Sequence, residues 1–155
     1  MITAVDTNVL LDLLLPDEPR GQEAERALAN ALLVGALIVS EPVYAELAVS
    51  FTGQPDLDGF LAATGIRVEP SRRESLHRAG VAWRQYARQR RAAVTCGQCG
   101  NEQEVHCARC GAAIRLRQHV LADFLIGAHA AVQADRLLTR DRRTYRTYFP
   151  ELTLI

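Results

Sequence analysis

The stretch HVLADFLIGAHAAVQADRLLTRD, residues 119–141, decides the fold class of this chain. Residues 120–132 read as a nearly all-apolar helix that carries one acid, Asp123. The apolar strand 136–139 follows and leads directly into a second acid, Asp141. A helix this apolar is expected to be buried on almost every side, where an unpaired carboxylate is costly. The two acids therefore need an explanation other than solubility.

Short apolar strands alternate with helical patterns through most of the chain. The sequence predicts strands at Ile2–Val5, Ala36–Val39, Ile66–Val68, Arg136–Thr139 and near Leu152–Ile155. Helices are expected over residues 18–34, 41–50, 56–63 and 71–91. Ser40 is expected to cap the second of these helices, with Pro42 in its first turn. This alternation predicts an α/β fold with a parallel sheet core.

Length, composition and charge narrow the classes of protein. The 155 residues, 48% of them hydrophobic, suit one domain over residues 1–155 with a real core. No stretch resembles a signal peptide, and the longest apolar run, residues 31–39, is too short to span a bilayer. We therefore expect a soluble cytoplasmic protein with no membrane partner.

The charge is unevenly distributed although its net value is zero. Residues 1–66 hold ten acids and two arginines, whereas residues 67–155 hold eight acids and sixteen arginines. Because arginine binds phosphate with two parallel hydrogen bonds, the basic second half is compatible with nucleic acid. Genome-driven arginine usage and solvated helix faces explain it equally well.

Four acids are expected to meet at one end of the sheet. Asp6 and Asp141 each follow a strand directly, and ligands of open parallel sheets bind beyond the carboxyl ends of the strands. Asp123 falls in the first turn of the helix before the strand 136–139, and Glu46 lies in the helix after the second strand. Clustered carboxylates resist ionising together, and a hard cation, Mg²⁺ or Mn²⁺, stabilises them. Such an ion supports phosphodiester hydrolysis.

Each acid also has a purely structural explanation. Asp6 is a good cap for a following helix, and the helix dipole favours Asp123 in a first turn. Asp141 can pair with the two arginines that follow it, and a lone glutamate such as Glu46 is usually solvent-exposed. The joint placement of the four acids, and no single one, favours a catalytic site.

Four stretches together resemble the PIN-domain ribonucleases, and among them the VapC-type toxins of bacterial toxin–antitoxin pairs. They are VDTNVLLDLL at 5–14, VYAELA at 43–48, DFLIGAHA at 123–130 and LLTRDRRTYRTYFPEL at 137–152. The resemblance covers nearly the whole chain except residues 92–118. It implies a three-layer α/β/α domain with a parallel sheet and an acidic site for Mg²⁺ or Mn²⁺.

The resemblance also implies roles for individual residues. The family's four catalytic acids fall on Asp6, Glu46, Asp123 and Asp141. Three of them, Asp6, Asp123 and Asp141, are expected to hold the metal, and Glu46 to complete the site directly or through water. The neighbouring polar residues of the family match Thr7, Asn8 and Thr139, of which Asn8 is expected to orient Asp6 or a water. His129 also matches, and we expect it to pack rather than to act as a base.

The resemblance further implies an activity and partners. VapC-type toxins are hydrolases, metal-dependent endoribonucleases that cut structured RNA such as tRNA or rRNA. A small antitoxin silences them by inserting its tail into the acidic groove, and they usually pair as homodimers. Two alternatives stay open: a PIN-type nuclease of RNA maturation, and a non-catalytic zinc-hairpin module that binds nucleic acid or protein.

Residues 92–118 depart from this pattern and contain every cysteine of the chain. Cys96, Cys99, Cys107 and Cys110 form a C-x2-C-x7-C-x2-C pattern, and a glycine follows each pair. Two such turns facing each other make a four-thiolate Zn²⁺ site, so a small zinc-ribbon-like hairpin with a structural zinc is expected. Two disulfides or four free thiols are the alternatives, and His106 or His119 could replace a ligand. If the hairpin contacts RNA or the antitoxin, Arg109, Arg115 and Arg117 are the expected contacts; surface decoration is equally compatible.

Overall fold

The computed structural model describes residues 1–14, 18–89, 93–96, 98–114 and 121–155. Its strands are β1 (Ile2–Val5), β2 (Ala36–Val39), β3 (Ile66–Val68), β4 (Ala93–Thr95), β5 (Glu102–Glu104) and β6 (Arg136–Leu138). Its helices are α1 (Thr7–Leu14), α2 (Glu18–Leu33), α3 (Glu41–Leu47), α4 (Gln54–Ala63), α5 (Arg73–Gln89), α6 (Leu121–Gln133) and α7 (Arg142–Tyr148), with a 3₁₀ turn at Ala48–Ser50. None of these helices is both long and apolar enough to cross a bilayer.

The main sheet is parallel and has the strand order β3-β2-β1-β6. The chain proceeds from β1 outward to β2 and β3, and then returns to the other side of β1 to add β6. The strand order therefore reverses between β1 and β6, which is where parallel sheets place their ligand crevices. A backbone hydrogen bond from the Asp6 N–H to the carbonyl of Leu138, 3.0 Å long, extends the pairing of β1 with β6 one residue past the end of β1.

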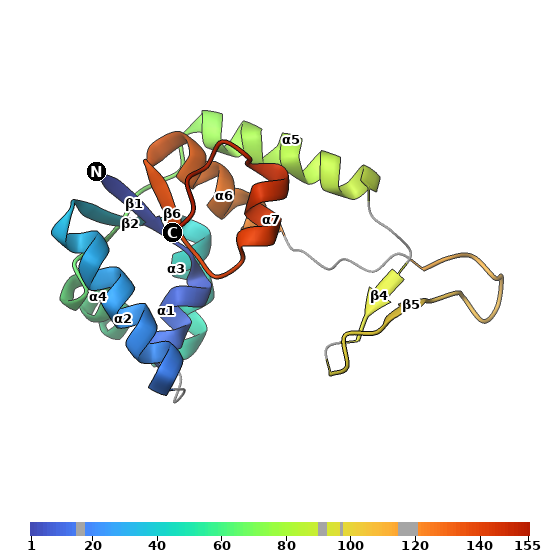
Figure 1. Ribbon diagram of the computed structural model, residues 1–155, viewed down its shortest axis with the longest axis horizontal. Helices are drawn as coiled ribbons and strands as arrows, with labels where there is room; N and C mark the ends of the chain where they lie inside the picture. Colours follow the sequence, from blue (N-terminus) through green and yellow to red (C-terminus); the bar gives the residue numbers. More distant parts are fainter. Residues whose placement is uncertain (15–17, 90–92, 97, 115–120) are drawn as a thin grey trace.

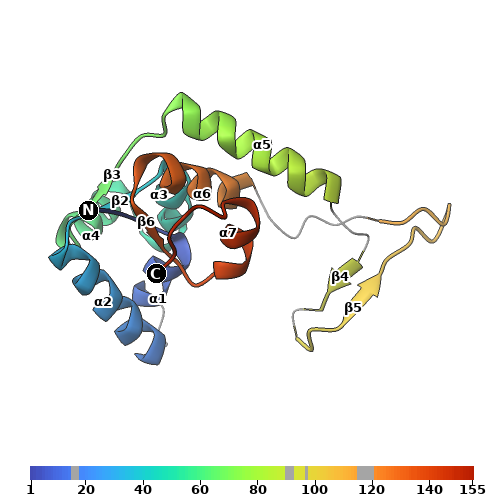
Figure 2. The same ribbon diagram turned by 45° about the horizontal axis from the view of Figure 1, so that its top comes forward.

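Helices cover both faces of this sheet, which gives the three layers expected from the sequence. α1 and α2 lie on one side, whereas α5 and α6 lie on the other (Figures 1 and 2). Every residue of α6 except Leu121 is buried or half-buried, in agreement with its apolar sequence. The outer helix α5 packs on α6 through Trp83 and Tyr86, whose rings lie 5.4 and 5.5 Å from the ring of Phe124.

A glycine permits the closest helix contact near the carboxyl end of the sheet. A Cβ atom at Gly127 of α6 would lie 2.5 Å from the ring of Phe149 and 2.9 Å from that of Tyr145. Both rings are almost fully buried. Only glycine therefore lets α7 and the residue after it lie directly against α6, and this contact positions the ring of Tyr145.

Several predictions about the elements need correction. Ser40 occupies the N-cap position of α3, but its hydroxyl makes no capping bond and is buried without a partner. The expected last strand reduces to one bridge, between Leu137 and Leu154, although three backbone hydrogen bonds tie residues 153–155 to residues 137–139. The helix α7 was not predicted, because its sequence RRTYRTY lacks an apolar stripe.

The segment between α5 and α6 projects away from the main domain (Figures 1 and 2). β4 and β5 pair antiparallel in a two-stranded sheet of their own, and His106 and Ala113 form a further bridge. The predicted insertion 92–118 lies in this segment. Arg115, Arg117 and His119 fall outside the described residues.

Candidate acidic site

A cavity of about 320 Å³ opens at the carboxyl end of the main sheet. All four predicted acids line it: Asp6, Glu46, Asp123 and Asp141. Two polar residues, one leucine and one tyrosine complete the lining: Thr7, Asn8, Leu11 and Tyr145. The acids come from the end of β1, from α3, from the first turn of α6 and from the residue before α7. Among the described residues no arginine lines this cavity, so four carboxyl groups share a small space there without a positively charged side chain.

Asp6 is held rigidly by its neighbours. Its Oδ2 atom accepts hydrogen bonds from Asn8 Nδ2 and Thr139 Oγ1, both 2.6 Å long. The Thr139 hydroxyl in turn accepts a 3.0 Å bond from the backbone N–H of Asp141. Asn8 and Thr139 thus both bind the Asp6 carboxylate, and Thr139 connects the ends of β1 and β6.

Glu46 joins the same cavity from α3, where it is half-buried. The Thr7 hydroxyl donates a hydrogen bond to Glu46 Oε2. Thr7 begins α1 directly after Asp6, so this bond fixes the position of α3 relative to the first acid. Glu46 is therefore not a fully solvent-exposed glutamate, which was the structural alternative for this residue.

Asp141 has a structural role in addition to its place in the cavity. One of its oxygens, Oδ1, accepts a 3.1 Å hydrogen bond from the backbone N–H of Thr144 and so caps α7. This bond explains why a short helix begins here. The Asp141 carboxylate therefore binds a backbone N–H group of α7 rather than pairing with Arg142 and Arg143 on the surface.

Tyr145 is a residue of the cavity that the sequence reasoning missed. It lies one helical turn after Asp141, and its hydroxyl donates a hydrogen bond to the Asp6 carboxylate. Burial raises the pKa of Tyr145 well above its ordinary value, and the charges of Asp6, Asp123 and Asp141 raise it further. The spacing of four residues from Asp141 is the signal that could have identified it, once α7 is recognised as a helix.

The electrostatics of Asp6 reflect this crowding. Burial raises the pKa of its carboxyl group from 3.8 to about 6, with a smaller contribution from the nearby charge of Asp123, although hydrogen bonds from Thr139 and Tyr145 oppose the rise. A strongly perturbed carboxyl group in a cleft is typical of functional sites. A cation in the cavity would favour the ionised form.

The donor set fits a hard divalent cation. The side-chain oxygens of Asp6, Asp123 and Asp141 are the ligand type that Mg²⁺ and Mn²⁺ prefer. No group of three or more His, Cys, Asp or Glu side chains is already arranged to hold a metal ion within the described parts of the chain. Mg²⁺ usually binds one or two carboxylates and keeps several waters, so a preformed three-carboxylate cage is not required.

A larger cavity of about 630 Å³ elsewhere does not offer the same chemistry. It lies among α3, α4 and the 3₁₀ turn and contains two acids, Glu41 and Asp58. Ser71 donates to Glu41 through both its N–H and its hydroxyl, and Tyr44 donates to Asp58. Both carboxylates already serve structural bonds, so the smaller acidic cavity is the better candidate.

His129 is buried away from the acids and serves the fold. Its Nε2 atom lies 2.9 Å from the carbonyl oxygen of Glu69, and burial lowers its pKa. Gln133, one helical turn later, accepts bonds from the Arg72 N–H and the Ser75 hydroxyl. The two side chains anchor the connection from β3 to α5, which agrees with the expected packing role of His129.

An ion pair between a buried acid and a half-exposed arginine beside the cavity was also missed. Asp12 of α1 is buried, and its Oδ2 atom lies 2.8 Å from Arg140 Nε. Arg140 also donates to the backbone carbonyl of Asn8 through its side chain and to Asn8 Oδ1 through its N–H. The pair ties α1 to the loop after β6 and so supports Asn8 and, through it, Asp6.

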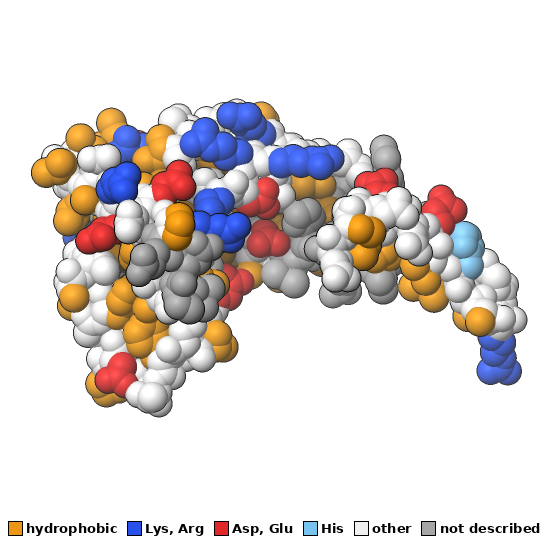
Figure 3. Space-filling view, turned by 60° about the horizontal axis from the view of Figure 1, so that its bottom comes forward, with side chains coloured by type: hydrophobic (Ala, Val, Ile, Leu, Met, Phe, Trp, Pro, Cys, Tyr) orange, Lys and Arg blue, Asp and Glu red, His pale blue; other side chains and the backbone are white. Residues whose placement is uncertain are grey.

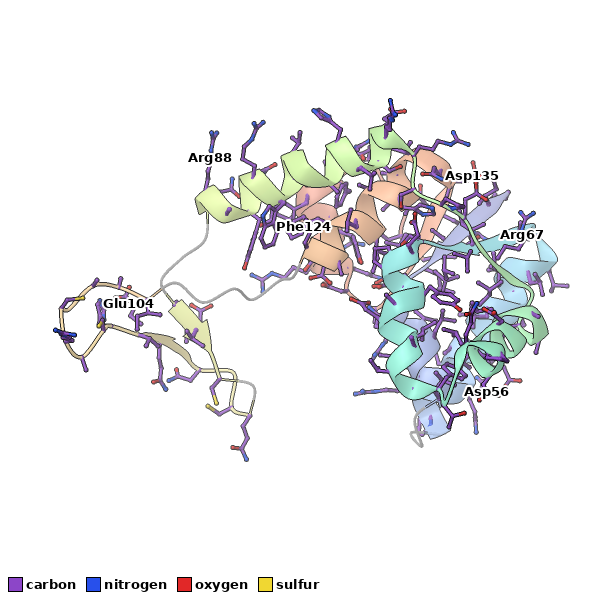
Figure 4. All side chains as sticks on the ribbon, turned by 180° about the vertical axis from the view of Figure 1, so that it is seen from behind. Asp56, Arg67, Arg88, Glu104, Phe124 and Asp135 are labelled. Carbon is purple, nitrogen blue, oxygen red and sulfur yellow. The ribbon has the colours of Figure 1, made fainter. Side chains whose placement is uncertain are left out.

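The four cysteines lie in the projecting segment as two pairs of free thiols. Hydrogen-bonding contacts join Cys96 to Cys99 and Cys107 to Cys110. The structure does not bring the two pairs together: the sulfur atoms form two separate groups at different ends of the segment (Figure 4). The expected arrangement of facing turns is therefore not present in this conformation.

Comparisons with known proteins support the architecture. The family model of the PIN domain matches residues 3–150. No curated protein sequence gave a significant match. Among solved structures, the chain resembles VapBC-1 from nontypeable Haemophilus influenzae, with a TM-score of 0.62, 18% identity and coverage of 100% of this chain and 97% of that chain.

Two further structures are similar over their whole length. VapBC2 from Rickettsia felis, solved with a DNA fragment from its promoter, has a TM-score of 0.58 and 15% identity, with 100% of this chain and 98% of that chain covered. FitAB bound to an IR36 DNA fragment has a TM-score of 0.59 and 17% identity, with 100% and 94% covered. Likeness at such low identity establishes a shared fold.

Proposed function

Because this chain belongs to the PIN-domain family, whose members are generally nucleases, we propose that it is a metal-dependent endoribonuclease, the toxin of a toxin–antitoxin pair. The observation that carries the proposal is the convergence of four acids on one cavity at the reversal point of a parallel sheet. The four acids come from four separate segments of the chain, so a chance grouping by sequence proximity does not explain it.

In this mechanism Asp6, Asp123 and Asp141 would hold a Mg²⁺ or Mn²⁺ ion, and Glu46 would complete the site directly or through water. The bound cation would supply the positive charge that an RNA phosphate needs in this acidic cavity. Asn8, Thr139 and Tyr145 keep the Asp6 carboxylate in one orientation through their hydrogen bonds. Thr7 keeps Glu46 turned into the cavity.

The surface supports RNA as the substrate. Arg73, Arg84 and Arg88 are exposed on α5 and, at spacings of eleven and four residues, lie on one face of that helix. The opposite face of α5 packs on Phe124, the neighbour of Asp123. One face of the molecule shows acidic side chains near its centre and arginines along its upper edge (Figure 3). Such arginines can bind phosphates on either side of the cleaved bond.

The proposed partners follow from the structural neighbours. VapBC-1 and VapBC2 are complexes of the kind that pairs a VapC-type toxin with its antitoxin, and their fold extends over the whole of this chain. We propose that a cognate antitoxin binds this chain and covers the acidic cavity. We also propose that the chain pairs with a second copy as a homodimer and acts in the cytoplasm. A short reading frame directly upstream of the gene supports the toxin assignment, and its absence favours the alternative of an RNA-maturation nuclease.

The decisive test is RNA cleavage by the purified chain. Wild-type protein is expected to cut tRNA or rRNA with Mg²⁺ or Mn²⁺ and to stop when the metal is chelated. Asp123→Asn is expected to slow cutting by about 10²–10³-fold, whereas Glu25→Gln, which changes an exposed acid on α2, retains the wild-type rate. RNA binding without cleavage under any divalent metal would instead support the non-catalytic module. Sequencing of RNA ends after induced expression then identifies the substrate.

A further inference from the structure

Two turns of the projecting segment are built alike. In the first, Gly100 N–H donates to the carbonyl of Cys96 at 2.9 Å, and the Cys96 N–H donates to the Asn101 carbonyl at 2.8 Å. In the second, Gly111 N–H donates to the carbonyl of Cys107, and Cys107 N–H to the Ala112 carbonyl, both at 2.8 Å. The same bonds recur eleven residues apart.

The glycines are required by this turn. Gly100 has φ 72° and Gly111 has φ 73°, in the left-handed region that side chains with a Cβ atom disfavour. Within the described residues only one other glycine, Gly65, has a positive φ. Two turns that repeat both the hydrogen bonds and the unusual backbone angle indicate one chemical purpose for both.

Each turn directs donors at the sulfur of its first cysteine. The backbone N–H groups of Gln98 and Cys99 donate to the Cys96 sulfur, and those of Arg109 and Cys110 donate to the Cys107 sulfur. The second cysteine of each turn also lies within hydrogen-bonding reach of the first. Such N–H groups stabilise negative charge on sulfur, which is the form of cysteine that binds a metal.

Within its described residues the segment has no hydrophobic core of its own. Between residues 93 and 114, no side chain whose exposure the structure describes is buried. β4 and β5 have three residues each, and an isolated hairpin of this size is marginal in water. A structural metal is the usual substitute for a missing core in a segment this small.

We propose that Cys96, Cys99, Cys107 and Cys110 bind one Zn²⁺ per chain, and that binding folds the segment until the two cysteine turns face each other. Residues 101–107 run extended between the turns, paired with β4 at one end and with residues 112–114 at the other. At about 3.3 Å per residue this stretch separates the turns by about 20 Å. Closing the site therefore requires this stretch to bend and part of this pairing to open.

The ligand chemistry selects the ion. Four sulfur donors favour a soft or borderline cation, and closed tetrahedral thiolate sites are typical of Zn²⁺. The acidic cavity offers only oxygen and selects hard ions, so the two sites do not compete for the same metal. Because all four thiols must lose their protons, zinc affinity falls as the pH is lowered.

A cobalt titration of the full, reduced and chelator-treated chain tests the proposal. The expected result is an intense sulfur-to-cobalt absorption band with tetrahedral visible bands, saturating at one Co²⁺ per chain and displaced by Zn²⁺. Amide hydrogen exchange of residues 98–111 is expected to slow when Zn²⁺ is added. Cys107→Ser should weaken metal binding at least about 100-fold, whereas Asp123→Asn should leave the band unchanged.

Other results overturn the proposal. Saturation at two ions per chain, with Cys107→Ser losing only one, means that each turn binds its own ion. A band that appears only in a dimeric species means that two chains share the site. Absence of a sulfur-to-cobalt band in the reduced chain, or isolation from cells as two disulfides without zinc, removes the metal site altogether.

Discussion

The acidic cavity is held by the main sheet, whereas the cysteine segment is held by two short turns and little else. At the cavity, strand pairing, the Asp141 cap and the ion pair of buried Asp12 with Arg140 fix the side chains before any cation binds. In the segment, local bonds fix each cysteine pair, and no long-range contact of a buried side chain brings the pairs together. The contrast indicates that the fold creates the acidic site, whereas zinc must create the sulfur site.

The largest expected effect is on catalysis, and it separates the two regions. Asp123→Asn should lower the rate of RNA cleavage by about 10²–10³-fold, because it removes a charge expected to hold the cation. Cys107→Ser should remove zinc and retain cleavage of a short RNA. Single-turnover rates and metal content, measured on both variants, provide the check. If loss of zinc lowers the cleavage rate of the short RNA as much as the Asp123→Asn substitution does, the two regions form one site.

The next effect concerns pH and the crowding at Asp6. A carboxyl group whose pKa is raised on folding stabilises the folded chain below its unfolded pKa of 3.8, and this contribution is lost as the pH rises through about 6. The change amounts to about 3 kcal/mol, from a shift of about two pKa units. In the presence of chelator, Asp6→Asn should therefore match wild type in unfolding free energy at pH 3, below the unfolded pKa, and exceed it at pH 7.5. An equal difference at both pH values would show that Asp6 is not perturbed.

The sequence was sufficient for the elements that position the acids. β1, β2 and β3 were predicted to the residue, and the four acids were placed at the carboxyl ends of strands or in the expected helices. The order of the strands was not accessible, because pairing depends on contacts between distant segments rather than on local periodicity. Tyr145 was missed for a related reason. It lies on α7, and that helix is stabilised by the Asp141 cap and the contact with Gly127 rather than by an apolar repeat that the sequence would reveal.

The cysteine segment shows the opposite limit. Spacing alone indicated four metal ligands, but it did not indicate how the two cysteine pairs lie relative to each other. Local turn geometry follows from glycine and backbone bonds, which sequence can suggest. The distance between the two turns depends on the path of the whole segment. Because the segment has no described buried side chain, its apolar pattern does not predict that path.

A smaller effect tests how far the main domain depends on one close contact. Gly127→Ala should destabilise the domain by about 1–3 kcal/mol, because the added Cβ would lie 2.5 Å from the buried ring of Phe149. Gly59→Ala is the matched control, since that helical glycine has no atom within 4 Å of an added Cβ. The control should stabilise α4 by about 0.5–1 kcal/mol. Urea unfolding distinguishes the two, and equal shifts would contradict the packing argument.

The smallest expected effect is the one zinc has on the main domain. Removal of zinc should change its unfolding free energy by less than about 0.5 kcal/mol, because the segment shares no buried side chain with the sheet in the described structure. Trp83, the only tryptophan, packs on Phe124 between α5 and α6 and therefore reports unfolding of the main domain by fluorescence. Amide exchange of residues 98–111 reports the segment. Zinc removal should accelerate the exchange and leave the urea midpoint of Trp83 unchanged. A fall in that midpoint would mean that the zinc-bound segment docks against the acidic domain, and the two regions would then have to be treated as one cooperative unit.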